Sequence, residues 1–367
     1  MPIVTPGSGG RDMRAELLPP ELLPLFDDRF VRSCDLVDEY VRALARVVVR
    51  DAELAGAGRG RVAPGMERAV DWLWRAAGGA TDAPAPREPA AIAAEQEAHD
   101  PSALPTYRIA AVAAGVWPAV LRGELRGDAA LFSPENAGLW PDYFSNDNPL
   151  YAINNRVGAL AAQRWLPAGP LRILELGGGL GSATLALLDA LEATGRLGDV
   201  AAYRFTELAP PFLRRAQRTL GACRPGLPLT YARVDIDAPL AGQGIAPESV
   251  DLAWAVNTVH VARDLGATLA ELRTALRPGG LLLLGECLRP FPGLPVYPEF
   301  VFLLLDPFRA PRLDPELRPE PGFLTPESWL ASLRAAGFTA PQVFPDVARI
   351  REVYPAFFVG ALGARRP

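Results

Sequence analysis

Lysine is absent from this chain: all 37 of its Lys and Arg positions are arginine. Several large classes of protein depend on a lysine. They include enzymes that form a Schiff base with their substrate, nucleotide-binding loops that end in Gly-Lys-Ser or Gly-Lys-Thr, and protein kinases, which use the lysine of their third strand. The sequence therefore excludes all three classes.

Cysteine and histidine are scarce, with three and two copies in 367 residues. Cys34, Cys223 and Cys287 lie far apart and lack the spacing of a metal site. An odd, sparse cysteine count in a long chain is typical of reduced thiols rather than of a disulfide framework. We therefore expect a cytoplasmic protein that holds no metal.

Long hydrophobic runs are also missing. The most apolar runs, 281–284 and 301–305, are shorter than the roughly 20 residues that span a bilayer. The first ten residues lack the basic and apolar regions of a signal peptide. A formal net charge of −5 repels phosphate backbones. These features predict a soluble protein with no membrane and no nucleic acid as partner.

The chain is long enough for two domains, and its first half has a helical pattern. Apolar residues recur there at the spacing of amphipathic helices, which predicts helices over 34–55, 66–77, 107–123 and 149–165. The Pro- and Ala-rich stretch 80–105 suits a surface linker or a broken helical hairpin. We therefore predict a flexible N-terminus over residues 1–20 and a helical lid domain over 21–165, with no strand before residue 170.

After residue 170 short apolar runs alternate with helical segments. The pattern predicts strands at 171–176, 200–205, 229–234, 250–256 and 281–286, with two later strands near Gln342 and Phe357. Short apolar strands that alternate with helices form parallel sheets covered on both faces. Residues 166–367 are thus predicted to form an α/β domain of the Rossmann-like type.

A glycine-rich turn follows the first of these strands. Glu175 precedes Gly177, Gly179 and Gly181 in the pattern E-x-G-x-G-x-G, and glycines there let the backbone come close to a ligand. A carboxylate at Glu175 would face the cationic amino-acid part of S-adenosylmethionine, whereas it would oppose the pyrophosphate of a dinucleotide. Nicotinamide binding and a turn that only permits tight packing remain alternatives.

Acidic residues follow the next two strands. Glu207 stands where a carboxylate can hold ribose hydroxyls, and Asp235 is placed to reach an adenine. Open α/β sheets bind ligands at the carboxyl ends of their strands, beside the point where the strand order reverses. Three successive strand ends therefore point to one nucleotide site, with S-adenosylmethionine as the favoured cofactor.

Residues 117–338 resemble the C-methyltransferase domains of modular polyketide synthases. The resemblance rests on Asn-Pro-Leu-Tyr-Ala-Ile-Asn-Asn-Arg-Val (148–157), Arg-Phe-Thr-Glu-Leu (204–208), Val-Asp-Ile-Asp (234–237), Asn-Thr-Val-His (257–260) and Arg-Pro-Gly-Gly (277–280). It implies a class I S-adenosylmethionine-dependent methyltransferase from natural-product biosynthesis, with a seven-stranded Rossmann-like sheet and an N-terminal helical lid. It also implies that Ile236 and Asn257 contact the cofactor.

The resemblance further implies a catalytic pair, His260 after the fourth strand and Glu286 at the end of the fifth. A carboxylate beside an imidazole fixes its tautomer and stabilises the imidazolium that forms when the ring takes a proton. His260 would then remove a proton from the methyl acceptor. His99, the other histidine, is interpreted as a surface residue.

The acceptor is less well defined. Tyr143, Tyr151, Asn155, Arg289 and Phe300 are candidate substrate contacts, but the aromatic, proline-rich run after Cys287 departs from the synthase pattern. We favour an acidic carbon, as in β-ketoacyl groups. Methylation of a hydroxyl or carboxylate, and a cofactor-binding protein that transfers no methyl group, remain alternatives. The acceptor can be a small molecule or be presented on a carrier or peptide, and the protein can be a homodimer.

Overall fold

The structure is a computed structural model that describes residues 13–52, 62–78 and 87–367. These residues form two compact units. The sheet unit comprises the described residues up to Pro24, Ala152–Pro292 and Arg312–Pro367. The helical unit comprises the described residues of Leu25–Tyr151 together with Gly293–Pro311. The predicted flexible N-terminus lies mostly outside the described residues, although α1 covers Arg14–Leu17.

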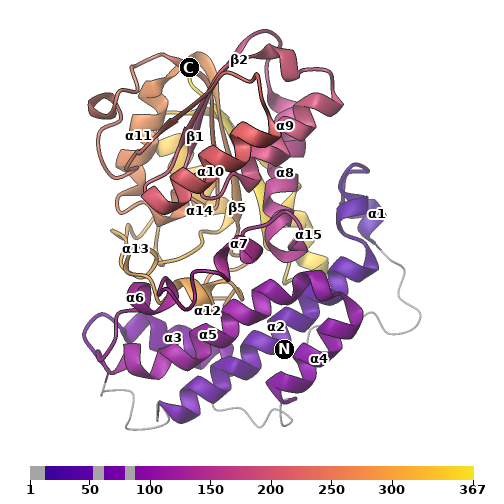
Figure 1. Ribbon diagram of the computed structural model, residues 1–367, viewed down its shortest axis with the longest axis vertical. Helices are drawn as coiled ribbons and strands as arrows, with labels where there is room; N and C mark the ends of the chain where they lie inside the picture. Colours follow the sequence, from indigo (N-terminus) through magenta and orange to yellow (C-terminus); the bar gives the residue numbers. More distant parts are fainter. Residues whose placement is uncertain (1–12, 53–61, 79–86) are drawn as a thin grey trace. The chain divides into compact units, whose positions relative to one another are not determined.

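The sheet unit is built on seven strands in the order β3-β2-β1-β4-β5-β7-β6 (Figure 1). Their bounds are β1 Leu171–Leu176, β2 Val200–Thr206, β3 Leu229–Ala232, β4 Val250–Val256, β5 Leu276–Cys287, β6 Thr339–Phe344 and β7 Val359–Arg365. Strands β1 to β5 pair in parallel, and β7 runs antiparallel to β5 and β6. The structure confirms the predicted Rossmann-like sheet of seven strands.

Helices cover both faces of this sheet, because its strands are apolar on both sides. They are α8 Pro149–Trp165, α9 Ser182–Ala193, α10 Pro210–Cys223, α11 Leu265–Ala275, α14 Pro326–Ala335 and α15 Val347–Val353, with short 3-10 turns η4 Leu197–Asp199, η5 Ala241–Gln243 and η6 Val259–Val261. Leu174 of β1 and Leu282 of β5 share one core cluster with α11 and α14. On the opposite face α8 lies so close to β4 that a Cβ at Gly158 would stand 2.7 Å from the Trp254 ring.

Eight helices make up the described part of the helical unit: α2 Asp28–Asp51, α3 Glu67–Ala76, α4 Pro89–His99, α5 Leu104–Leu121, α6 Gly127–Leu131, α7 Trp140–Tyr143, α12 Glu299–Phe302 and α13 Asp306–Arg309. The short turn η3 Pro101–Ala103 accompanies them, and the turn η1 Leu23–Leu25 lies at the boundary between the two units in the chain. The predicted helices near 34–55, 66–77 and 107–123 are present as α2, α3 and α5.

The structure divides the chain differently from the predicted contiguous blocks, since Gly293–Pro311 belongs to the helical unit. The Phe300 ring lies near both Trp72 and Trp117, with centroids 6.1 and 6.2 Å away. Trp72 Nε1 donates to Glu299 Oε2 at 2.6 Å, and Trp117 Nε1 donates to the Phe300 carbonyl at 2.9 Å. Buried aromatic packing and these two hydrogen bonds therefore hold the late segment on helices more than 180 residues earlier.

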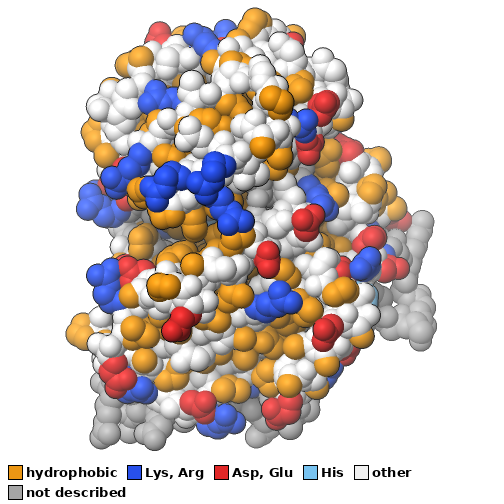
Figure 2. Space-filling model, viewed as in Figure 1, with side chains coloured by type: hydrophobic (Ala, Val, Ile, Leu, Met, Phe, Trp, Pro, Cys, Tyr) orange, Lys and Arg blue, Asp and Glu red, His pale blue; other side chains and the backbone are white. Residues whose placement is uncertain are grey.

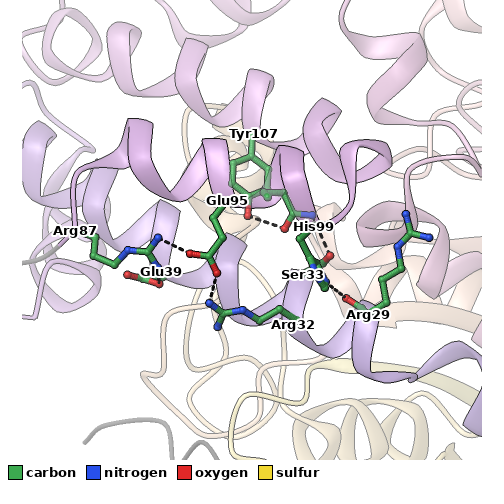
Figure 3. Close-up of polar contacts among 9 residues, drawn as sticks. Arg29, Arg32, Ser33, Glu39, Arg87, Glu95, His99 and Tyr107 are labelled. Carbon is green, nitrogen blue, oxygen red and sulfur yellow. Dashed lines mark hydrogen bonds and ion pairs between the residues drawn. The ribbon is translucent and has the colours of Figure 1, made fainter.

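Helix α4 occupies part of the stretch predicted as a linker or broken hairpin, and residues 79–86 of that stretch lie outside the described residues. Ion pairs and hydrogen bonds attach it to its neighbours (Figure 3). Glu95 pairs with Arg32 of α2 and with Arg87, and Gln96 accepts from the Tyr107 hydroxyl at 3.1 Å. His99 contacts the Arg29 carbonyl through Nε2 at 3.0 Å. His99 therefore has a structural partner within the helical unit.

One segment, Pro101–Leu121, is long and apolar enough to cross a membrane by length and composition. Within the helical unit α5 packs against α2, α4, α7 and α12, and Trp117 is fully buried. A core helix has the same composition, because it is apolar around its whole circumference.

Figure 2 shows basic side chains gathered over the part of the sheet unit where α10 lies in Figure 1. Helix α10 exposes Arg214, Arg215 and Arg218 and contains no Asp or Glu. This local positive surface contrasts with the net charge of −5 for the chain.

Candidate active site

The carboxyl ends of the parallel strands converge where the strand order reverses. β1 lies between β2 and β4, so the connections after β1 and β4 leave on either side of a crevice. Ligands of open α/β sheets bind at this switch point. The glycine turn, Glu207, Asp235, His260 and Glu286 all belong to this one edge of the sheet unit.

The glycine turn has the backbone that its sequence predicts. Gly177, Gly179 and Gly181 have φ values of +58°, +58° and +92°, a region that L side chains rarely adopt. A Cβ at Gly177 would stand 2.4 Å from Thr258 Cγ2, so that glycine permits contact with the loop after β4. A Cβ at Gly179 would meet no atom within 4 Å. Gly179 is therefore the position where the backbone faces open space that a ligand can use.

Glu207 lies beside this turn at the end of β2. Its carboxylate accepts hydrogen bonds from Gly179 N at 2.9 Å and from Ala209 N at 2.8 Å, and the residue is 9% exposed. Two backbone donors fix the carboxylate and leave part of its acceptor capacity open. This geometry suits recognition of a diol such as ribose.

Asp235 follows β3 in a loop held by one glutamine. Gln243 accepts from Asp235 N at 2.7 Å and donates to the Asp235 carbonyl at 2.8 Å. Asp235 Oδ1 accepts from Asp237 N at 2.9 Å, and the Ile236 carbonyl accepts from Thr268 Oγ1 at 3.1 Å. The loop is thus rigidly built, with Ile236 packed against the core.

Glu175 is embedded in the sheet, where it is 1% exposed. Its Oε2 accepts from Thr184 Oγ1 at 2.6 Å and from Tyr203 Oη at 2.8 Å. Burial raises the pKa of Glu175 from 4.5 to about 7, against the opposing effect of these hydrogen bonds. The structure therefore shows a carboxyl group engaged by two interior hydroxyls, and its contact with a cofactor stays a prediction.

His260 and Glu286 meet at the end of the neighbouring strands β4 and β5. The distance from His260 Nδ1 to Glu286 Oε2 is 2.7 Å, and the two residues are 4% and 0% exposed. Glu286 Oε1 also accepts from Val259 N at 3.2 Å. A carboxylate that is ionised only accepts, so with Glu286 in that form the bond requires the proton on Nδ1 and makes Nε2 the acceptor nitrogen of the ring.

Asn257 shapes the loop between β4 and His260. It has a φ of +49°, which is uncommon for a residue with a side chain. Its N donates to the Gly285 carbonyl at 2.8 Å, and its Oδ1 accepts from Cys287 N at 3.1 Å. Asn257 thus ties the two segments that carry the His260–Glu286 pair.

The structure adds two residues that the sequence did not reveal. Arg318, 1% exposed, donates to the carbonyls of His260 and Ala262, and the Phe323 ring lies 4.8 Å from the His260 ring. Burial lowers the pKa of Arg318 to about 10, although the negative charges of Glu286 and Asp237 act in the opposite direction. Arg318 therefore stays charged at neutral pH. No sequence signal separates it from the other arginines of the chain.

Among the described residues there is no group of three His, Cys, Asp or Glu side chains that could hold a metal. The glycine turn, Glu207, Asp235 and the His260–Glu286 pair all lie at the carboxyl edge of the parallel strands. Residues 174–282, which span this edge from β1 to β5, match the model of a family described as a methyltransferase domain. The chain contains a methyltransferase domain.

Known proteins and solved structures show similarity to this chain over a longer range. Highly reducing polyketide synthase 2 of Gibberella zeae is 31% identical over 193 residues, which are 52% of this chain and 7% of the synthase. The crystal structure of the CurJ carbon methyltransferase aligns with a TM-score of 0.75 at 22% identity, over 96% of this chain and 97% of that one. The trans-methyltransferase CalH, solved with SAH, gives a TM-score of 0.68 at 20% identity, over 93% and 92%. These likenesses establish the fold of S-adenosylmethionine-dependent carbon methyltransferases, with its helical part.

The predicted substrate contacts of the methyltransferase fall in both units. Tyr143 and Tyr151 are neighbours in the helical unit, with ring centroids 5.7 Å apart, and Phe300 is packed beside tryptophans there. In the sheet unit Asn155 is fully buried, and the Arg289 guanidinium donates to the carbonyls of Pro321 and Phe323. Phe300 and Arg289 therefore have clear structural contacts, and the role of all five in substrate binding stays a prediction.

Proposed function

We propose that this methyltransferase transfers the methyl group of S-adenosylmethionine to an acidic carbon of a natural-product-type acceptor, with His260 as the base and Glu286 as its partner. The observation that carries the proposal is the buried 2.7 Å contact between His260, in the turn after β4, and Glu286, at the end of β5. Strand β4 is the neighbour of β1, which leads into the glycine turn. A base at this place can remove a proton beside the predicted nucleotide site.

The residues present fit the cofactor. The open space at Gly179 admits a ligand against the backbone, and the oriented Glu207 carboxylate suits the ribose hydroxyls. Asp235 and Ile236 lie on the loop after β3, where the proposal has them contact the adenine. When bound, S-adenosylmethionine supplies an electrophilic methyl group on a sulfonium.

The chain's own contribution is to hold the acceptor and remove its proton. His260 Nε2 takes the proton from the acceptor, and the electron pair left behind attacks the methyl carbon. Transfer of the methyl group to this electron pair would leave the cofactor's sulfur as the neutral thioether of SAH. Glu286 stabilises the imidazolium, which then returns its proton to solvent. Positioning of the two reactants accounts for much of the acceleration.

A β-ketoacyl group suits this mechanism, because the carbon between its two carbonyls is acidic and a base can remove its proton. A hydroxyl acceptor also needs a base, whereas a carboxylate needs none. The relatives are multidomain polyketide synthases, of which the chain spans 7% in the example above, so we propose that a carrier can present the acceptor. A free small molecule or a peptide is the alternative.

The test is methyl transfer from labelled cofactor to a β-ketoacyl thioester, with NMR to locate the new methyl group. The proposal predicts a methyl on the carbon between the two carbonyls. It also predicts that kcat falls by about a hundredfold or more in His260→Ala. In Glu286→Gln, kcat should also fall. His99→Ala removes the other histidine, which lies in the helical unit, and is the matched control with wild-type kcat.

Three outcomes would contradict parts of the proposal. Methyl groups found only on oxygen would refute the carbon acceptor and keep the base. A wild-type rate in His260→Ala would refute the base and favour a carboxylate acceptor. Binding of the cofactor without transfer to any acceptor of the panel would favour a protein that does not methylate.

A further inference from the structure

Residues 312–324 form a segment that lies against the loops carrying both members of the acid–base pair. It begins where Arg312 N donates to the Arg263 carbonyl at 2.7 Å, three residues after His260. Asp314 and Arg318 exchange two backbone hydrogen bonds of 2.9 and 3.0 Å, which close a tight loop and fix the backbone of Arg318.

The side chain of Arg318 joins this segment to the His260 loop. Its Nη1 donates to the Ala262 carbonyl at 2.7 Å, and its Nη2 donates to the carbonyl of His260 itself. Both acceptors belong to the loop that follows β4. A planar guanidinium can hold two carbonyls in one fixed geometry, which an ammonium group cannot do.

The other end of the segment is joined to the strand that carries Glu286. Arg289, three residues after Glu286, donates from Nε to the Phe323 carbonyl at 3.1 Å and from Nη2 to the Pro321 carbonyl at 2.9 Å. Its backbone N donates to the Leu324 carbonyl at 2.9 Å. Phe323 then places its ring 4.8 Å from the His260 ring. The segment therefore connects the supports of both catalytic partners.

Arg318 is a buried arginine whose side-chain hydrogen bonds all go to the loop that carries His260. The guanidinium is buried, and among the described residues no carboxylate forms a salt bridge with it; its Nε has no hydrogen-bond partner. Burial of a charge is costly, and this one is held in direct contact by the carbonyls of His260 and Ala262, with the negative charges of Glu286 and Asp237 acting in its favour. The two hydrogen bonds of Arg318 fix the backbone of the loop that carries His260.

We propose that Arg318 is a positioning residue, which holds the backbone of His260 so that the imidazole Nδ1 stays in contact with Glu286 and Nε2 faces the acceptor. This inference rests on the proposed function, in which His260 is the base and Glu286 is its partner. It assigns the 312–324 segment a role in catalysis, because a displaced base loses alignment with the proton that it must remove.

The test uses NMR of the whole chain labelled with ¹⁵N-histidine. Only His99 and His260 contribute signals, and His99→Asn identifies which is which. In the wild type His260 should give one ring tautomer with a slowly exchanging Nδ1 proton. Arg318→Met should broaden or abolish that Nδ1 signal and leave the His99 signals unchanged. Arg318→Lys keeps the charge without the two-carbonyl fork, so it should also weaken the signal.

The matched control is Arg309→Met. Arg309 is also a buried arginine that donates to a carbonyl, that of Leu303 at 2.7 Å, but it belongs to the helical unit. It should leave the His260 signals as in the wild type. Where a suitable acceptor is available, kcat should fall about 10- to 100-fold in Arg318→Met, with little change in KM.

An unchanged His260 Nδ1 signal in folded Arg318→Met overturns the inference. If that variant does not fold, an unchanged signal in Arg318→Lys overturns it. Failure of the proposed function has a different signature, because His260→Ala would then transfer methyl groups at the wild-type rate whatever the NMR of the Arg318 variants shows.

Discussion

Glu175 makes the stability of the sheet unit depend on pH. Its carboxyl group is buried, and burial raises its pKa from 4.5 to about 7. Each pKa unit is equivalent to about 1.4 kcal/mol, so the rise corresponds to about 3 kcal/mol of unfolding free energy. The folded protein binds this proton more tightly than the unfolded chain. The stabilisation is therefore complete below pH 4.5 and is lost as the pH rises through about 7.

Glu175→Gln removes this titration and keeps the shape of the side chain. Its amide oxygen can still accept from Thr184 and Tyr203, which now hydrogen-bond to the carboxylate. Relative to the wild type, the variant should become more stable by about 3 kcal/mol as the pH is raised from about 5 to 8. Urea unfolding at each pH measures this difference.

The control for loss of a negative charge is Glu97→Gln, since Glu97 is an exposed carboxylate of α4. It separates the effect of the buried group from the effect of net charge. Identical pH dependence of the unfolding free energy in the wild type and Glu175→Gln would refute the reasoning.

Two further substitutions test the packing that supports the site. Gly177→Ala should lower the unfolding free energy by about 1–3 kcal/mol, because φ is +58° there and the new Cβ would stand 2.4 Å from Thr258; Gly198→Ala, in open space without a positive φ, is the control. Equal melting temperatures for Gly177→Ala and Gly198→Ala would contradict this prediction. Trp72→Phe should destabilise the helical unit by about 1–3 kcal/mol, because the buried Glu299 carboxylate loses the indole N–H that donates to it at 2.6 Å. Calorimetry measures this loss, and an unfolding transition at the wild-type temperature would disprove the prediction.

The central strands of the sheet could be predicted from the sequence, because β1 and β4 are buried on both faces. The bounds of β1 and β4 agree with the predicted 171–176 and 250–256, where apolar runs are uninterrupted. β5 begins at Leu276, earlier than the predicted 281, since Leu276 pairs with Val250 across an irregularity. The local sequence there, Arg-Pro-Gly-Gly, carries no information about that pairing.

The helical unit was harder to predict, since long-range contacts decide it. Helix α4 buries Ile92 and Gln96 among its residues and is attached by polar contacts, so it lacks the apolar stripe that predicts an amphipathic helix. The assignment of Gly293–Pro311 to this unit depends on Trp72, Trp117 and Phe300, which are far apart in sequence. Spacing within a segment cannot reveal such contacts.

The candidate site divides in the same way. The family resemblance implied the pairing of His260 with Glu286, and the 2.7 Å contact at the ends of the neighbouring strands β4 and β5 agrees with it. Arg318 could not be predicted, because it is 58 residues from His260 in a proline-rich loop of a chain rich in arginine. Residues that react sit at strand ends, whereas residues that position them can come from any loop.

The most direct test of the central claim is calorimetric titration of the purified protein with S-adenosylmethionine and with SAH, its demethylated product. The account predicts that the wild type binds both ligands and that Glu207→Ala, which removes the carboxylate beside Gly179, binds neither measurably. Absence of binding to either ligand by the folded wild type would contradict the cofactor site on which the proposed function depends.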